Sequence, residues 1–166
     1  MNEVRVAAKA IEIRRADMTA AASRALILAL NQELSARYPE DGATHFRLDP
    51  DEVAEGRGAF LIAYCGGDPV GCGAIRRIDG ATAELKRMYV QASARGRGIG
   101  RLVLEALEAE GRRLGVTRLV LETGDRLAEA LALYAAAGFV PIPRFGEYID
   151  APLSVCMAKP LAVGVE

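Results

Sequence analysis

The loop Arg95-Gly96-Arg97-Gly98-Ile99-Gly100 constrains this chain most, because it joins an extended run from Leu85 to Val90 to a strongly amphipathic segment. Glycines allow positive φ angles and let the backbone approach a ligand closely. The helix expected after the loop directs its unpaired N–H groups and the positive end of its dipole into that loop, which arginines flank. This combination predicts an anion site, most naturally for a phosphate or pyrophosphate.

Two familiar phosphate-binding loops are excluded by their spacing. A P-loop requires Gly-Lys-Ser/Thr, and no lysine follows the glycines here. The dinucleotide fingerprint requires a third glycine three residues after the second, and that position is Arg101. What remains is the pattern Arg-x-x-Gly-x-Gly, which spans Arg95, Gly98 and Gly100.

Length and composition indicate one domain covering residues 1–166, with residues 1–9 disordered. Hydrophobic residues make up 51% of the chain, yet no run reaches the roughly 18 apolar residues of a membrane span. A net charge of −1 argues against a nucleic-acid partner. The three scattered cysteines favour reduced thiols and a cytoplasmic location, and with one histidine they offer no metal-ligand spacing.

Hydrophobic periodicity predicts an α+β fold with a mixed sheet. The expected strands cover residues 11–15, 59–65, 70–78, 82–90, 116–122, a short stretch at 140, and 153–158. The expected helices begin after a cap at Asp17 or Thr19, at Gly98, and just before Leu127. Tight turns make the second to fourth strands antiparallel, whereas the helix that follows the glycine loop makes strand 116–122 parallel to strand 82–90.

The segment from Ala83 to Phe139 resembles the GCN5-related N-acetyltransferases (the GNAT family), whose pyrophosphate signature is Gln/Arg-x-x-Gly-x-Gly/Ala. A second element supports the resemblance, because Tyr134-Ala135-Ala136-Ala137-Gly138-Phe139 matches the family's Tyr-x-x-x-Gly-Phe. The resemblance implies a GNAT fold, with a mixed central sheet of about six to seven strands flanked by helices. In that fold acetyl-CoA lies where two parallel strands splay apart.

Carried onto this chain, the resemblance implies which residues bind the cofactor. Backbone groups of Met88 and Val90 are expected to hold the pantetheine arm. The pyrophosphate is expected among Arg95, Gly96, Arg97, Gly98, Gly100 and Arg101; the alternative is a glycine turn that only connects strand to helix. One departure is Leu127, where many members carry an Asn or Gln that touches the cofactor arm. Either Arg126 compensates or that contact is absent.

Helical spacing alone makes Tyr134 a core residue. The resemblance instead implies that its hydroxyl protonates the departing CoA thiolate. A phenol has a pKa of about 10 and a thiol one near 8.5, so a phenol beside the sulfur can give up its proton as charge develops.

Glu84 lies eleven residues before Arg95, the spacing at which histone-type members carry a glutamate that acts as general base. A protonated amine must lose its proton before it attacks, and a carboxylate can accept it. The alternative for Glu84 is an ordinary strand glutamate paired with a neighbouring cation. Glu122 is a second candidate, and the single histidine, His45, is an expected bystander in a polar loop.

The resemblance implies an acetyl-CoA-dependent N-acetyltransferase that moves the acetyl group directly to a primary amine in a ternary complex, without a metal. A small-molecule amine is favoured because residues 143–154 carry aromatic and acidic side chains that suit a compact cation. The alternatives are an enzyme for protein or peptide amines and a non-catalytic acetyl-CoA-binding module. A homodimer is also expected, from the family's habit and from a strand at 153–158 whose edge would need cover.

Overall fold

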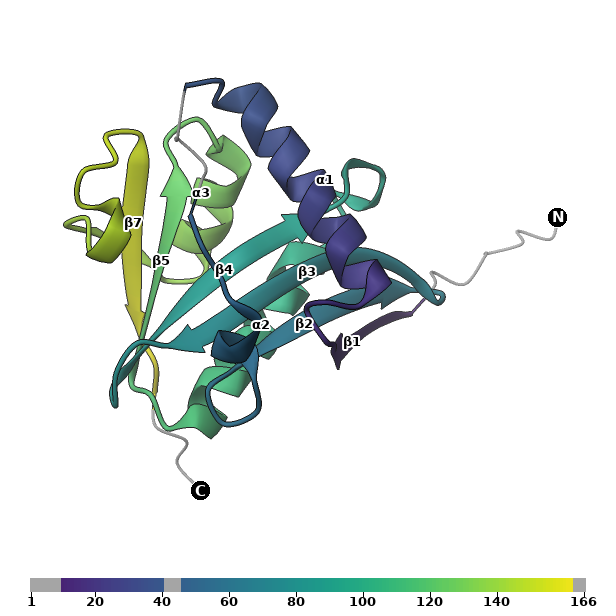
Figure 1. Cartoon of the computed structure of the whole chain (residues 1–166), viewed down its shortest axis with the longest axis horizontal. Helices are drawn as coiled ribbons and strands as arrows, with labels where there is room; N and C mark the ends of the chain where they lie inside the picture. The colour runs from purple at the N-terminus through teal and green to yellow at the C-terminus, as the bar shows by residue number, and fades with distance from the viewer. Residues whose placement is uncertain (1–9, 41–45, 163–166) are drawn as a thin grey trace, which may run out of the picture.

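The computed structural model describes residues 10–40 and 46–162, so the expectations for residues 1–9 and for His45 lie outside it. Seven strands form one sheet in the order β1-β2-β3-β4-β5-β7-β6 (Figure 1). The strands are β1 (Ile11–Arg15), β2 (Gly58–Cys65), β3 (Asp68–Arg77), β4 (Thr82–Val90), β5 (Arg118–Gly124), β6 (Val140–Ile142) and β7 (Ser154–Pro160). The helices are α1 (Ala21–Arg37), α2 (Ile99–Leu114) and α3 (Ala128–Ala136), with short 3-10 turns η1 (Pro50–Val53), η2 (Ala92–Ala94) and η3 (Gly146–Tyr148). The predicted α+β fold is confirmed.

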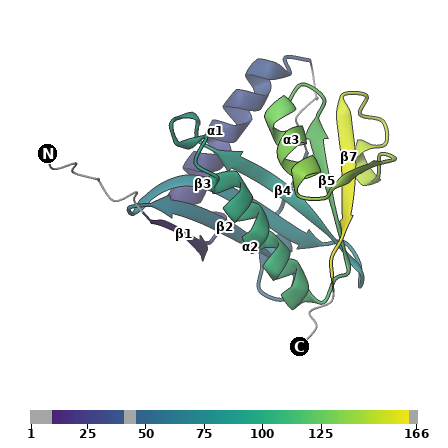
Figure 2. The same ribbon diagram turned by 180° about the vertical axis from the view of Figure 1, so that it is seen from behind.

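The helices cover both faces of the sheet, α1 on one and α2 with α3 on the other (Figures 1 and 2). Alternation along β2 explains this three-layer arrangement. Ala59, Leu61 and Ala63 belong to the core under α2, whereas Phe60 and Ile62 belong to the core under α1. Because both faces of β2 are buried, its sequence is a nearly continuous apolar run.

The start of α1 differs from the expectation. Its N-cap is Ala20, without a side-chain cap, so the prediction of Asp17 or Thr19 as cap is wrong. Asp17 instead accepts hydrogen bonds from the backbone N–H and the hydroxyl of Thr19, at 2.8 Å and 2.7 Å. The Asp17 carboxylate therefore closes a turn just before the helix, and in that position it cannot also cap the first helical N–H groups.

Strands β4 and β5 are parallel and then part, as the resemblance implies. Their register runs from Thr82–Arg118 to Leu85–Leu121 and stops there. Strand β4 continues along β3 as far as Val90, past a register shift close to Arg87. The backbone edge of β4 beyond Leu85 is thus left without a strand partner on the β5 side.

Glycines shape both ends of α2. Gly96 and Gly98 have φ angles of 81° and 77°, in the left-handed region that disfavours other residues, and the helix begins directly after Gly98. Gly115, with φ 78°, ends it as predicted. A Cβ atom on Gly100 would lie 3.3 Å from Leu133, so a glycine there lets α2 and α3 approach closely.

Strand β7 is not at an edge of the sheet. It pairs with β5 on one side and with β6 on the other, so the edge expected at residues 153–158 is wrong. The edge strands are β1 and the short β6, because residues after α3 return to cover the outer side of β7. The homodimer stays a prediction, now without this argument.

Candidate functional site

A cleft opens where β4 and β5 part, between α1 and α3. It has two halves, which share Leu30, Leu34, Met88, Leu127, Ala130 and Tyr134. We call one the glycine-loop half, whose further lining includes Tyr89, Val90, Arg95, Gly96, Gly98 and Gly100. We call the other the Glu122 half, whose further lining includes Tyr38, Phe46, Lys86, Arg87, Glu122, Tyr148, Leu153 and Ser154. The shared residues make the two halves neighbours within one cleft.

The structure brings most of the predicted cofactor residues together in the glycine-loop half. These are Met88, Val90, Arg95, Gly96, Gly98 and Gly100. Arg97 and Arg101 are exposed and do not line the cleft, and Arg101 pairs with Glu105 one turn along α2, at 3.2 Å. The first N–H groups of α2 have no intrahelical acceptor and lie beside this half, which makes it suited to an anion.

Arg95 is already engaged inside the protein. One of its terminal nitrogens lies 2.7 Å and 2.9 Å from the two carboxylate oxygens of Glu33, and its Nε donates to the carbonyl of Val90 at 2.8 Å. Glu33, on α1, was not identified from the sequence, where it is one polar residue among several on an exposed helix face. Arg95 therefore ties α1 to the end of β4.

Arg126, the candidate to compensate for Leu127, is engaged elsewhere in the protein. The guanidinium of Arg126 binds the carboxylate of Glu40 and donates to the carbonyl of Arg37 at 2.8 Å. Leu127 itself lines both halves of the cleft with an apolar side chain. Neither residue supplies the side-chain amide that other members use.

Tyr134 serves both the core and the cleft. Its side chain is buried and packs edge-to-face on Phe139, with 5.8 Å between ring centroids. Burial, and secondarily the charge of Glu122, raises the pKa of the Tyr134 hydroxyl. Tyr134 therefore stays protonated at neutral pH, at the junction of the two halves.

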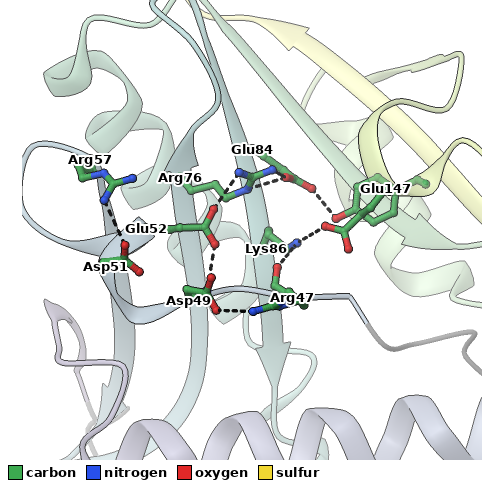
Figure 3. Close-up of polar contacts among 10 residues, drawn as sticks. Arg47, Asp49, Asp51, Glu52, Arg57, Arg76, Glu84, Lys86 and Glu147 are labelled. Carbon is green, nitrogen blue, oxygen red and sulfur yellow. Dashed lines mark hydrogen bonds and ion pairs between the residues drawn. The ribbon is translucent and has the colours of Figure 1, made fainter.

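Glu84 lies behind the cleft. It is fully buried, accepts from Arg76 Nε at 2.9 Å, and accepts from the Tyr148 hydroxyl at 2.6 Å (Figure 3). Tyr148 lines the cleft, whereas Glu84 does not. The described geometry thus connects Glu84 to the cleft through Tyr148.

Further charged side chains surround Glu84 and Arg76 (Figure 3). Arg76 also binds Glu52 at 2.9 Å, which ties η1 to β3. Lys86 Nζ donates to the Arg47 carbonyl at 2.6 Å and lies 3.2 Å from a Glu147 oxygen. Lys86 thus has a carboxylate partner within the protein.

Glu122 is the carboxylate among the residues that line the Glu122 half of the cleft. It ends the apolar part of β5, accepts a hydrogen bond from the Ser154 hydroxyl, and has a pKa raised chiefly by burial. The sequence signal for it was an acidic residue directly after an apolar strand. Its charge also acts on Tyr134, so the two groups lie within electrostatic reach of each other.

Two further observations concern the described residues only. No cluster of three or more His, Cys, Asp or Glu side chains among them could hold a metal ion. None of the helices in residues 10–40 and 46–162 combines the length and the apolar character that crossing a membrane needs.

Comparison with known proteins agrees with this architecture. The Acetyltransferase (GNAT) family matches residues 25–139. IAA acetyltransferase of Azospirillum brasilense is 43% identical over 137 residues, which cover 82% of this chain and 88% of that protein. The N-acetyltransferase YsnE of Bacillus subtilis, itself uncharacterized, is 36% identical over 61% of this chain and 69% of its own length.

Solved structures share the fold. An acyl-CoA N-acyltransferase from Klebsiella pneumoniae superposes with a TM-score of 0.78 at 34% identity, over 92% of this chain and 98% of that one. A GNAT acetyltransferase of Elizabethkingia anophelis, solved with acetyl-CoA bound, has a TM-score of 0.66 at 19% identity, over 91% and 98% of the two chains. With the parted strands, the glycine loop and the family match in agreement, this chain belongs to the GNAT family and is an acetyltransferase that acts with acetyl-CoA.

Proposed function

We propose that this enzyme transfers the acetyl group directly to a primary amine of a small molecule, with both substrates bound in the cleft at once. The observation that supports this most is the position of Tyr134, which lines both halves of the cleft. A group held along the glycine-loop half would end beside Tyr134, and an acceptor in the Glu122 half would reach the same place. Such an arrangement favours direct transfer, in which proximity supplies much of the rate.

The glycine-loop half fits the proposed cofactor. Gly96 and Gly98 leave open space above the loop, and the free N–H groups of α2 suit a pyrophosphate. Arg95, Arg97 and Arg101 supply positive charge around the loop, while the unpaired edge of β4 at Met88 and Val90 offers backbone groups to an extended arm. The Val90 carbonyl already accepts from Arg95, so the backbone contact at that residue falls to its N–H. Bound acetyl-CoA supplies the activated acetyl thioester.

Tyr134 is the proposed general acid. Its raised pKa keeps the proton on the hydroxyl until negative charge develops on the departing sulfur. Among the described residues no hydrogen bond occupies that hydroxyl, so it is available to a bound ligand.

Two carboxylates compete for the role of base, and the geometry favours Glu122. It lines the cleft, and its raised pKa brings it closer to that of the proton it must accept. Glu84 is held by Arg76 and by the Tyr148 hydroxyl, which suits a positioning residue that fixes Tyr148 in the cleft wall. The proposal therefore assigns proton removal to Glu122, directly or through water, and keeps Glu84 as the alternative to be tested.

A small-molecule acceptor is supported by the named relative, IAA acetyltransferase, and by the aromatic and leucine side chains that enclose the Glu122 half. The test is release of CoA thiol with a panel of small amines, amino acids and lysine-containing peptides. Turnover confined to small acceptors supports the proposal. Turnover only with peptides favours a protein acetyltransferase, and CoA binding without any turnover favours a non-catalytic binding module.

Sedimentation at micromolar concentration tests the predicted homodimer.

A further inference from the structure

Arg87 stands out in the wall of the cleft because of its backbone. Its φ is 58°, and no other non-glycine residue among those described has a positive φ. Regular alternation along β4 would turn every second side chain away from the cleft. Near the bulge at Arg87, however, the consecutive residues Lys86, Arg87 and Met88 all line the Glu122 half. Backbone strain of this kind persists mainly where it serves a site.

The guanidinium of Arg87 has hydrogen-bonding capacity to spare. One terminal nitrogen donates to the Phe46 carbonyl at 2.7 Å, and no ion pair in the described part of the chain involves Arg87. None of the buried side-chain nitrogen or oxygen atoms described lacks a partner, so the remaining N–H groups of this half-buried residue reach solvent. Arg87 thus lines the cleft and keeps N–H groups that the protein does not use.

The two cations of the Glu122 half differ in their partners within the protein. Its charged lining residues are Lys86, Arg87 and Glu122. Lys86 is satisfied by Glu147 and the Arg47 carbonyl, and Glu122 by the Ser154 hydroxyl. Arg87 is therefore the cation of this half that has no carboxylate partner in the described part of the chain, and its free N–H groups can bind an anion that enters the cleft.

We propose that the acceptor carries a carboxylate as well as the reacting amine, and that Arg87 binds this carboxylate. This inference rests on the proposed function and names its substrate class: a compact amino acid with an apolar body. The amine lies toward Tyr134 and Glu122, while Leu30, Phe46 and Leu153 enclose the apolar body. A polyamine, which has no anionic group, leaves Arg87 unpaired and is disfavoured.

Matched substrate pairs test this class. Phenylalanine is compared with 2-phenylethylamine, and leucine with 3-methylbutylamine, because each pair differs only in the carboxylate. For the wild type we expect a higher kcat/KM with each amino acid, after kcat/KM is corrected for the fraction of each amine that is unprotonated at the assay pH. In Arg87→Asn this preference should fall about ten- to hundredfold, as expected for loss of a charged hydrogen-bonded pair. Asparagine suits the test because it tolerates a positive φ.

Two control variants separate charge recognition from loss of the bulge. Arg87→Lys keeps the charge and should retain part of the preference for the amino acid. Arg24→Gln removes an exposed charge from α1 outside the cleft and should leave the preference unchanged. If Arg87→Asn lowers turnover of both members of a pair equally, or if the wild type prefers the decarboxylated amines, the inference is overturned while the acetyltransferase proposal stands.

A binding measurement tests Arg87 without turnover. With CoA present, 3-phenylpropanoate, which has the carboxylate but no amine, should raise the melting temperature of the wild type and not that of Arg87→Asn. Equal shifts in both proteins, or none in the wild type, would refute carboxylate binding at Arg87. Absence of turnover with every amine, together with the expected difference in shift, would instead count against the proposed function alone.

Discussion

At the scale of single residues, Tyr134 joins packing and proposed chemistry in one side chain. Its ring belongs to the core beside Phe139, and the same residue lines both halves of the cleft. Tyr134→Phe keeps the ring and removes the proton. We expect the melting temperature and CoA affinity to change little and kcat to fall about ten- to thousandfold. A wild-type kcat, with chemistry shown to limit the rate, would make Tyr134 a core residue only.

The two glutamates are distinguished by pH. The raised pKa of Glu122 means that, as a base, it loses activity as pH falls through that raised value. Glu122→Gln should lower kcat/KM about a hundredfold at neutral pH and abolish this acidic limb. Glu84→Gln should keep this loss of activity at low pH and mainly raise the KM for the acceptor. The reason is that the substitution weakens only the hydrogen bond that holds Tyr148 in place. If Glu84→Gln abolishes the loss of activity at low pH and Glu122→Gln keeps it, Glu84 is the base.

Stability provides a control for Glu122→Gln. A carboxyl whose pKa is raised on folding contributes most to stability below its ordinary pKa, and this contribution is lost as pH rises through the folded value. A neutral glutamine avoids that loss, so the variant should unfold no earlier than the wild type at neutral pH. Lost activity in this variant could not then be ascribed to unfolding.

At the scale of elements, the glycine loop and the start of α2 form the proposed pyrophosphate site. Gly98 has φ 77° and open space where a Cβ would lie. Gly98→Asp adds a negative charge there, so we expect CoA binding to be lost in calorimetry. Gly98→Asn is the matched control, because it has the same shape, tolerates the same φ and carries no charge. Equal losses in both variants would indicate bulk rather than charge as the cause.

The link between α1 and the glycine loop gives a second prediction at this scale. Glu33 places a carboxylate beside Arg95, close to where the phosphates of CoA would lie. Glu33→Gln removes a repulsive charge and should tighten CoA binding several-fold at low salt, with the difference fading at high salt. Weaker binding in Glu33→Gln would mean instead that Glu33 orients Arg95 for the ligand.

At the scale of the whole molecule, the network around Glu84 connects segments far apart in the sequence. Arg76 and Glu84 lie on β3 and β4, Glu52 on η1 and Tyr148 on η3. Arg76→Met leaves the buried Glu84 charge without its partner, and we expect the free energy of unfolding to fall by about 3 kcal/mol. In the double variant Arg76→Met/Glu84→Gln, urea unfolding should show much of that loss restored. Additive losses would mean that the pair is not coupled.

The sequence predicted the local structure and most residues of the glycine-loop half of the cleft. Strand and helix positions follow from periodicity, and the glycine loop from a pattern confined to six consecutive residues, 95–100. A helix cap was predicted correctly only where the backbone conformation strongly favours one residue type. Gly115 was identified correctly because its positive φ favours glycine, whereas the cap of α1 was not, because Asp17 binds a nearer partner.

Tertiary structure decided which strands lie at the edges of the sheet, which charges pair and which residues form the Glu122 half of the cleft. That β7 lies inside the sheet depends on β6 returning to its outer side, and no local pattern records this. The sequence left both Glu84 and Glu122 as candidate bases. In the structure Arg76 and Tyr148 hold Glu84 behind the cleft wall, while Glu122 lines the cleft where β4 and β5 part. Residue types and local dihedral preferences act over a few positions and are visible in the chain itself. Which carboxylate meets a cation, and which meets open space, depends on long-range packing between segments that only the folded molecule brings together.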